Sequence, residues 1–223
     1  MKKKNFYAAV FLLAAFVLWT VLIRLVDVKA IGPMESSVGF ATLNAFFHKL
    51  TGVNMTLYII TDWLGLVPVF VAFGFAAFGL IQWIKRKSLL KVDYSIFVLG
   101  AFYIATITAY LFFESFVVNY RPILIDGFLE ASYPSSTTLL VMCVMPTAVM
   151  QLNGRIKNKT ARKCITIAIT AFIAFMVVGR LISGVHWLSD IIGGILLSTG
   201  LVNLYRHIAK GNVKKAQNAK TSK

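Results

Sequence analysis

Two short stretches of the sequence carry residue types that bind and transfer phosphoryl groups. One lies at 121–138 and the other at 179–190. The candidate residues are Arg121, Ser135 and Ser136 in the first stretch, and Arg180, His186 and Asp190 in the second. Each arginine offers a fork of N–H donors that matches phosphate oxygens, and the backbone amides of a helix starting near the serines would add a positive dipole end. Together the two stretches predict an anion-binding site.

The spacing of His186 and Asp190 indicates chemistry as well as binding. The two residues are four apart, so on a helix they share one face, where the carboxylate can fix the imidazole tautomer and stabilise its charged form. A histidine oriented in this way is a candidate nucleophile toward phosphorus, and its attack would give a phosphohistidine that water hydrolyses. The two arginines would then stabilise charge on the oxygens of the transferring group.

The elements that must position these residues are membrane helices. Of the 223 residues, 58% are hydrophobic, and the mean hydropathy of +0.77 requires a bilayer as solvent. Apolar segments of spanning length are predicted at 6–26, 57–84, 93–117, 136–152, 164–184 and 186–205. We therefore predict an all-α polytopic membrane protein with six transmembrane helices.

The basic residues orient these helices. The net charge is +15, and 18 of the 23 Lys and Arg fall at the N-terminus or in 85–92, 153–163 and 206–223. Because short cytoplasmic loops are enriched in Lys and Arg, both termini are predicted to be cytoplasmic and both phosphate-handling stretches to lie on the outer side. The cations alternate with the spans and do not form one continuous patch, so nucleic acid is not the expected partner.

The segments outside the spans complete the expected organisation. Between the first two spans, Phe40, Leu43, Phe47 and Leu50 are spaced by three and four residues, which predicts a short amphipathic helix on the outer surface or, alternatively, a loop folded over the bundle. Residues 1–210 are predicted to form one membrane-embedded domain. Residues 211–223 are predicted to be a basic disordered cytoplasmic tail.

These motifs resemble the signatures of the type 2 phosphatidate phosphatase and vanadium haloperoxidase superfamily. Arg180, five residues, His186, three residues and Asp190 match the third signature; Tyr133-Pro134-Ser135-Ser136 resembles the second, and Arg121-Pro122 the end of the first. The resemblance implies a membrane bundle of six helices with its site near one face. It also implies His186 as the nucleophile, Asp190 as its orienting residue, and Arg121, Ser135, Ser136 and Arg180 as phosphate ligands.

The sequence departs from the pattern of this family at two chemically important positions. Glu114 stands where the family has a phosphate-binding Lys, and Thr137 stands where it has the His that protonates the leaving alcohol. Gly179 replaces the usual Ser, which is a minor change. Glu114 and Thr137 remain candidate catalytic residues because they occupy these positions, but Glu114 and Asp62 can also pair with Lys49 or with an arginine near the outer rim.

Two accounts of these departures are open. In the first, hydrolysis survives, either because a prenyl diphosphate expels a leaving group that needs no proton or because Glu114, Asp126 or Glu130 supplies the proton. In the second, the site binds a phosphorylated lipid headgroup without hydrolysing it, or transfers the phosphoryl group elsewhere.

The sequence therefore predicts a phosphatase of the cell membrane that uses no metal or other cofactor. Its expected substrate is a phospholipid phosphate or an isoprenoid diphosphate, such as undecaprenyl diphosphate, in the outer leaflet. The alternative prediction is a degenerate family member that binds phosphorylated lipid or scaffolds a partner.

Overall fold

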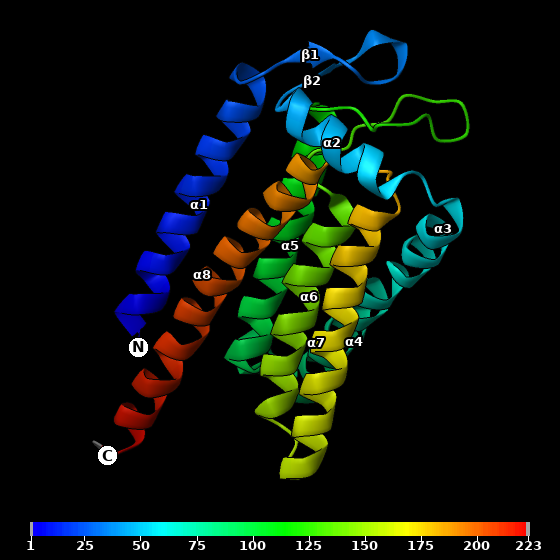
Figure 1. Ribbon diagram of the computed structural model, residues 1–223. Helices are drawn as coiled ribbons and strands as arrows, with labels where there is room; N and C mark the ends of the chain where they lie inside the picture. The colour runs from blue at the N-terminus through cyan, green and yellow to red at the C-terminus, as the bar shows by residue number, and fades with distance from the viewer. Residues whose placement is uncertain (1, 222–223) are drawn as a thin grey trace.

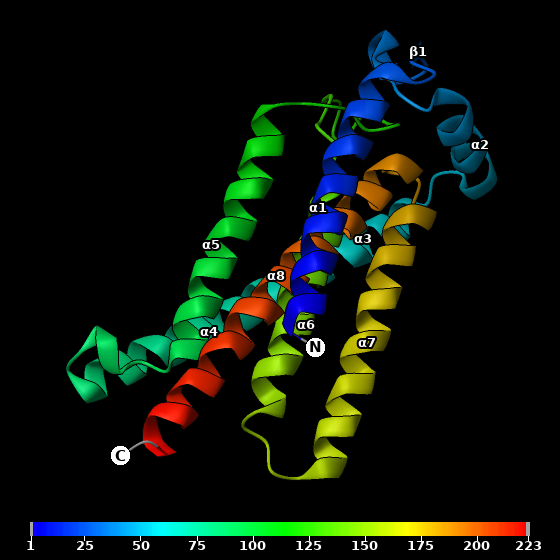
Figure 2. The same ribbon diagram turned by 90° about the vertical axis from the view of Figure 1, so that its left-hand side faces the viewer.

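The chain folds into long helices that run back and forth along a common direction (Figures 1 and 2). A computed structural model describes the backbone of residues 2–221 and the side chains of residues 3–209. The helices are α1 (Lys2–Leu25), α2 (Ala41–Thr51), α3 (Met55–Leu64), α4 (Leu66–Arg86), α5 (Tyr94–Ser115), α6 (Ser136–Asn153), α7 (Lys159–Ile182) and α8 (Leu188–Thr221). Two short strands, β1 (Lys29–Ala30) and β2 (Ser37–Val38), pair between α1 and α2, and 3-10 turns occupy Pro33–Glu35 and Leu89–Lys91.

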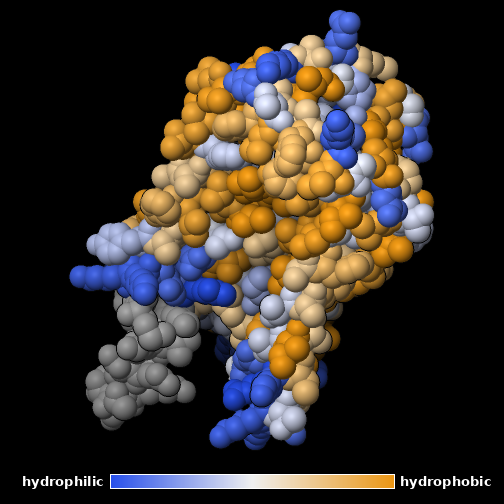
Figure 3. All heavy atoms as spheres, in the orientation of Figure 1, coloured by the Kyte–Doolittle hydropathy of each residue, from blue (hydrophilic) through white to orange (hydrophobic). Residues whose placement is uncertain are grey.

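Within residues 2–221, six segments are long and apolar enough to cross a membrane. They are Lys3–Leu25, Met55–Arg86, Tyr94–Ser115, Ser136–Asn153, Lys159–Ile182 and Leu188–Ala209. The predicted all-α membrane fold is confirmed, and each predicted span coincides with one of these segments. The side chains that face outward along them are largely apolar, and Figure 3 shows apolar residues covering the middle of one face and hydrophilic residues gathered toward its lower end.

The second span differs from the single helix predicted at 57–84, because it consists of α3 and α4. The break lies at Gly65, whose backbone N–H caps α3 by donating to the carbonyl of Asp62. Pro68 follows in the first turn of α4, where its missing N–H costs no intrahelical bond. As a separate helix, α3 packs against α7 and carries its polar residues to the site described below.

The helix α6 lies at the centre of the bundle. It contacts α4, α5, α7 and α8, while α1 packs along α8. The close approach of α1 requires Gly200, since a Cβ atom at that position would lie 2.8 Å from the side chain of Leu13. This packing sets the starts of α6 and α8 side by side, at the opposite end of the bundle from the two chain termini (Figure 1).

The predicted amphipathic helix between the first two spans is confirmed as α2. Its exposed apolar side chains include Leu43, Phe46 and Leu50, while Asn44 on the opposite face is fully buried. Phe40 stacks on Trp19 of α1 with ring centroids 4.8 Å apart, which fixes the start of α2 against the bundle. The helix therefore lies across the end of the bundle that carries the two motif stretches (Figure 1).

The predicted disordered tail at 211–223 overlaps the end of α8, and its disorder stays a prediction. The structure continues α8 as a helix to Thr221, and residues 222–223 of the predicted tail lie outside the described residues. Residues 209–221 contain three Ala and four Lys, which have high helix propensity, so this composition is also compatible with a helix.

Candidate functional site

The start of α6 supplies the first part of the site. Ser135 is the N-cap of this helix, and its hydroxyl accepts a hydrogen bond from the backbone N–H of Thr138 at 3.4 Å. The backbone N–H of Ser135 donates to the carbonyl of Asp190 at 3.1 Å, so the first turns of α6 and α8 are joined. A helix start places several backbone N–H groups and a positive dipole end at one point, which favours an anion there.

Arg121 reaches the site from the loop between α5 and α6. This loop is a narrow hairpin, closed by bridges between Tyr120 and Ala131 and between Ile125 and Phe128. The N–H of Arg121 donates to the carbonyl of Glu130 at 3.0 Å, and the Nε atom of Arg121 lies 2.9 Å from Oε2 of Glu130. Arg121, a predicted phosphate ligand, is buried although it carries a charge. Its side chain therefore faces the rest of the protein and not the solvent.

Arg180 lies near the end of α7 and is 1% exposed. Its guanidinium group donates to Thr61 at 3.4 Å and to Asp62 at 3.3 Å, both on α3. The Tyr58 ring, one turn earlier on α3, lies 5.0 Å from Cζ of Arg180 and 6.0 Å from Cζ of Arg121. An aromatic face attracts cations, so Tyr58 helps to keep the two guanidinium groups near one another despite their like charge.

His186 lies in the short turn between α7 and α8. Gly184 in this turn has φ of +69°, and a Cβ atom there would lie 1.9 Å from the carbonyl oxygen of Gly52, so only glycine allows this close approach. The His186 side chain is buried, and its Nδ1 atom is 3.9 Å from Oδ2 of Asp190. The two residues are therefore neighbours, as the spacing predicted, but at an ion-pair distance and not in a direct hydrogen bond.

The environment of His186 keeps its imidazole neutral. Burial lowers the pKa of His186 well below its usual value of 6.5, and the positive charges of Arg121 and Arg180 lower this pKa further. The predicted stabilisation of the charged form by Asp190 is therefore outweighed in the structure. A neutral imidazole has a free lone pair on one ring nitrogen, which nucleophilic attack requires.

This neutral burial predicts a pH-dependent stability. Since the unfolded chain binds a proton at His186 below about pH 6.5 and the folded chain does not, stability should fall on acidification by on the order of 1 kcal/mol per pH unit. The measurement is thermal unfolding of wild type and His186→Gln in detergent at about pH 7.5 and about pH 5.5. The wild type should lose more stability than the variant; equal losses would contradict a neutral His186.

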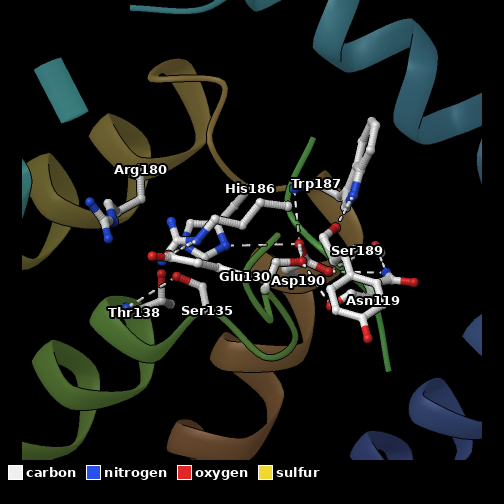
Figure 4. A network of polar contacts seen from close by, with 12 residues as sticks. Asn119, Glu130, Ser135, Thr138, Arg180, His186, Trp187, Ser189 and Asp190 are labelled. Carbon is white, nitrogen blue, oxygen red and sulfur yellow. Dashed lines mark hydrogen bonds and ion pairs between the residues drawn. The ribbon is translucent and has the colours of Figure 1, made fainter. Parts of the chain in front are cut away.

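Asp190 is held by hydrogen bonds from residues that were not among the predicted site residues (Figure 4). Its Oδ2 atom accepts from the Ser132 hydroxyl at 2.7 Å and from the backbone N–H of Trp187 at 3.0 Å. Its Oδ1 atom accepts from Asn119 at 3.2 Å and from the Ser189 hydroxyl at 3.4 Å. Donors from three segments thus hold the carboxyl group in place independently of His186.

The network extends to the surface helix α2 through Asn44. The Asn44 amide donates to the Ser189 hydroxyl at 2.9 Å and accepts from the Ser189 backbone N–H at 3.1 Å. Because Ser189 also donates to Asp190, α2 contributes to the position of the Asp190 carboxyl group.

Removing one donor of this network should destabilise the protein. Ser132→Ala leaves a buried carboxyl oxygen without its shortest hydrogen bond, and we expect a loss of about 1–3 kcal/mol. Chemical unfolding in detergent measures the change. Ser115→Ala is the matched control, because this exposed hydroxyl bonds only to the Leu111 carbonyl of its own helix, and its effect should stay within about 0.5 kcal/mol. Equal effects of the two substitutions would contradict the assigned role of Ser132.

Several polar side-chain atoms in this region have no hydrogen-bond partner among the described residues. These buried atoms are Nη1 of Arg121, Nε of Arg180, both ring nitrogens of His186 and Oγ1 of Thr138. Figure 4 shows Ser135, Thr138, Arg180 and His186 turned toward a common space, with Glu130 beside them. Buried polar atoms are normally paired, so a cluster of unpaired atoms that includes two arginine N–H donors is the pattern expected of a site for an anionic ligand.

A cavity of about 280 Å³ adjoins this cluster. Its walls come from α5, from the hairpin and from the start of α6, and include Tyr110, Glu114, Arg121, Glu130 and Ser136. Polar groups dominate its lining, whereas a larger apolar crevice of about 600 Å³ lies between α1 and the end of α5. Phe113 lines both spaces.

The two residues that depart from the family pattern, Glu114 and Thr137, lie in different surroundings. Glu114 is exposed and lines the cavity near Arg121, so an acidic group does stand in the candidate site. Thr137 is buried beside the junction of α3 and α4, where its methyl carbon would lie 3.7 Å from a Cβ atom at Gly65. Asp62 pairs with Arg180, which is one of the two pairings expected for it.

The comparisons with known proteins agree with the motifs. A family model described as the PAP2 superfamily matches residues 97–214. The chain belongs to the PAP2 superfamily. The crystal structure of the first transmembrane PAP2-type phosphatidylglycerolphosphate phosphatase from Bacillus subtilis matches with 18% sequence identity and a TM-score of 0.61. The match covers 94% of this chain and 97% of that chain, so the two share their fold over nearly their whole length. No curated protein matches this sequence.

The region matched by the PAP2 family model contains the predicted site residues but not all of the residues that contact them. Residues 97–214 contain all eight predicted site residues, whereas Tyr58 and Asp62, which contact Arg180, precede the matched region. Asn119 and Ser132 lie close to Arg121 and Ser135 in the sequence, and this proximity was the signal that could have drawn attention to them. No signal of this kind marks Tyr58, because only the packing of α3 against α7 brings it to the site.

Proposed function

We propose that this PAP2 protein is a membrane phosphatase that hydrolyses a lipid phosphate or an isoprenoid diphosphate at the outer leaflet. Membership of the superfamily supports phosphatase chemistry in general. The observation that carries the proposal is the cluster of unpaired buried polar atoms, in which Arg121 and Arg180 supply N–H donors and His186 supplies its ring nitrogens. A phosphate group would satisfy these donors together, since it offers several acceptor oxygens around one centre.

The proposed reaction has two steps. In the first, Nε2 of His186 attacks phosphorus while the bond to the leaving oxygen breaks, and Arg121 and Arg180 stabilise charge on the remaining oxygens. In the second, water attacks the phosphohistidine, which releases inorganic phosphate and restores the neutral imidazole. The hydrogen-bonded carboxyl group of Asp190 would orient the imidazole and stabilise the positive charge that develops on it.

The proposed orientation follows from the distribution of charge. Most Lys and Arg residues lie in the segments at the end that holds the chain termini, and membrane proteins keep such segments in the cytoplasm. The site at the opposite end of the bundle would then face the outer leaflet, where its substrate diffuses.

The test is phosphate release by purified protein in vesicles that contain phosphatidate or undecaprenyl diphosphate. Release clearly above protein-free vesicles, and dependent on His186, is the expected result. Binding of either lipid without any release would reject hydrolysis.

A second candidate function is binding of a phosphorylated lipid without turnover. It is favoured by the acidic partners of the two arginines, since Glu130 lies 2.9 Å from Arg121 and Asp62 lies 3.3 Å from Arg180. Together with Glu114, these acids weaken the attraction of the site for a phosphate dianion. In this alternative, lipid binding would survive His186→Ala.

A further inference from the structure

Glu130 is held opposite Arg121 by the backbone of the hairpin. The Arg121 N–H donates to the Glu130 carbonyl, and their side chains pair on the same side of the two segments. The hairpin turns at Asp126 and Gly127, which have φ of 50° and 84°. Since the backbone fixes both residues, the Glu130 carboxylate remains close to Arg121 even when another anion takes its place on the guanidinium group.

The two side chains differ in their exposure. The Arg121 side chain is 10% exposed and that of Glu130 is 40% exposed, so the carboxylate reaches the buried guanidinium group from the solvent side. Both residues line the cavity of about 280 Å³. A substrate whose phosphate binds at Arg121 would therefore bring its leaving group past Glu130 as it extends into this cavity.

Phosphate binding would also change the electrostatic surroundings of Glu130. A phosphate group that engages Arg121 replaces the Glu130 carboxylate there, which then faces negatively charged oxygens. The structure thus places a carboxyl group, the chemical group that a general acid requires, where the leaving group of a bound substrate would pass.

The other candidate proton donors are less well placed. Thr137, at the family's acid position, packs beside Gly65. Asp126 is exposed at the tip of the hairpin. Glu114 lines the cavity, but it makes no ion pair with Arg121 among the described residues. Glu130 alone among these acids contacts a predicted phosphate ligand.

We propose that Glu130 is the general acid of this enzyme and so takes the role of the missing histidine. This inference rests on the proposed phosphatase function. As Nε2 of His186 forms its bond to phosphorus, the phosphorus–oxygen bond to the leaving group breaks and the Glu130 proton passes to that oxygen, giving a neutral alcohol. Glu130 then accepts a proton from the water that attacks the phosphohistidine, which returns the enzyme to its starting state.

The proposal specifies the substrate class. An alkyl phosphate monoester expels an alkoxide, which needs a proton, whereas a diphosphate expels a phosphate ester that is stable as an anion. A site equipped with Glu130 is suited to lipid phosphate monoesters. Hydrolysis of these monoesters should depend on Glu130 far more than hydrolysis of substrates with acidic leaving groups.

The experiment compares two substrates that differ in their leaving group. In Glu130→Gln, kcat/KM for a short-chain phosphatidate should fall by about 10²–10⁴-fold, because general acid catalysis typically contributes that factor. For p-nitrophenyl phosphate, whose leaving group needs no proton, the loss should stay below about tenfold. Glu130→Asp should retain part of the phosphatidate activity, because it keeps a carboxyl group.

The matched controls are Glu114→Gln and Asp126→Asn, which neutralise the other two acids of this region. Both should leave the ratio of the two activities within about threefold of wild type. Equal losses on the two substrates in Glu130→Gln, or a gain on both, would overturn the proposal and make Glu130 only a partner of Arg121. A leaving-group-dependent loss in Glu114→Gln instead would assign the role to Glu114. Absence of phosphate release by wild type from both of these substrates and from undecaprenyl diphosphate would overturn the proposed function as well.

Discussion

Replacing His186 by alanine should reduce phosphate release by at least about 10³-fold, as expected for the loss of a nucleophile. The imidazole is buried and neutral, its Nε2 atom has no hydrogen-bond partner among the described residues, and both arginines act on it electrostatically. No other nitrogen nucleophile in the described part of the site could form the covalent intermediate, since arginine stays protonated. The variant should therefore lose turnover while it retains its fold.

The covalent intermediate provides the sharper measurement. Rapid quenching of wild type with radiolabelled substrate should trap label on the protein as an acid-labile and base-stable phosphohistidine, and His186→Ala should trap none. His207→Ala is the matched control, because His207 lies near the opposite end of α8 against Phe6 and should leave labelling unchanged. Label that persists in His186→Ala would contradict the assignment of the nucleophile.

Replacing Arg180 by alanine should lower kcat/KM by about 10²–10³-fold, as expected when a donor that stabilises transition-state charge is removed. Arg180 is 1% exposed, is fixed by Thr61 and Asp62, and keeps its Nε atom unpaired for the ligand. Arg180→Lys retains the charge but lacks the forked donors, so only part of the activity should return.

The measurement pairs steady-state kinetics with inhibition by inorganic phosphate. Arg180→Ala should weaken both catalysis and phosphate inhibition. Asp62→Asn, which removes the partner of Arg180 but keeps the guanidinium group, should not weaken phosphate inhibition. If Arg180→Ala left phosphate inhibition unchanged, Arg180 would not be a phosphate ligand.

The His186→Ala and Arg180→Ala variants also distinguish the two candidate functions, hydrolysis and binding without turnover. A phosphatase loses turnover in both variants, but only Arg180→Ala loses affinity for the phosphate group. A protein that binds lipid without turnover shows no activity in wild type, keeps headgroup binding in His186→Ala and loses it in Arg180→Ala.

The sequence predicted the membrane fold well, because the bilayer leaves few choices. A span must be an apolar helical segment long enough to cross the bilayer, so composition alone was sufficient for the six spans. The loops rich in Lys and Arg predict the orientation of these spans. The break between α3 and α4 was missed because the apolar run continues across it, and periodicity does not register a change of direction at Gly65. The weakly apolar, basic composition of residues 211–223 predicted disorder, which stays a prediction beside the helical backbone of α8 to Thr221.

The sequence also predicted candidate residues for the site, because their spacing within each motif is local. Asp190 follows His186 by one helical turn, and Ser135 precedes the first turn of α6, so both relations follow from helix geometry. The contacts between the motifs depend on how distant helices pack, and no local pattern encodes them. The pairing of Arg180 with Asp62 comes only from the packing of α3 against α7. The position of Tyr58 near both arginines and the contacts of Asn119 and Ser132 with Asp190 also require the loop between α5 and α6 to fold onto the bundle.

The sequence by itself determined that the protein folds in a lipid bilayer, the order of its helices and the residue types available for phosphate chemistry. The tertiary structure decided which acids accompany the arginines and whether His186 is charged. The reason is physical: hydrophobic pattern and helix spacing act over a few residues, whereas ion pairs, burial and the electrostatic potential at a site are sums over side chains that only the folded chain brings together.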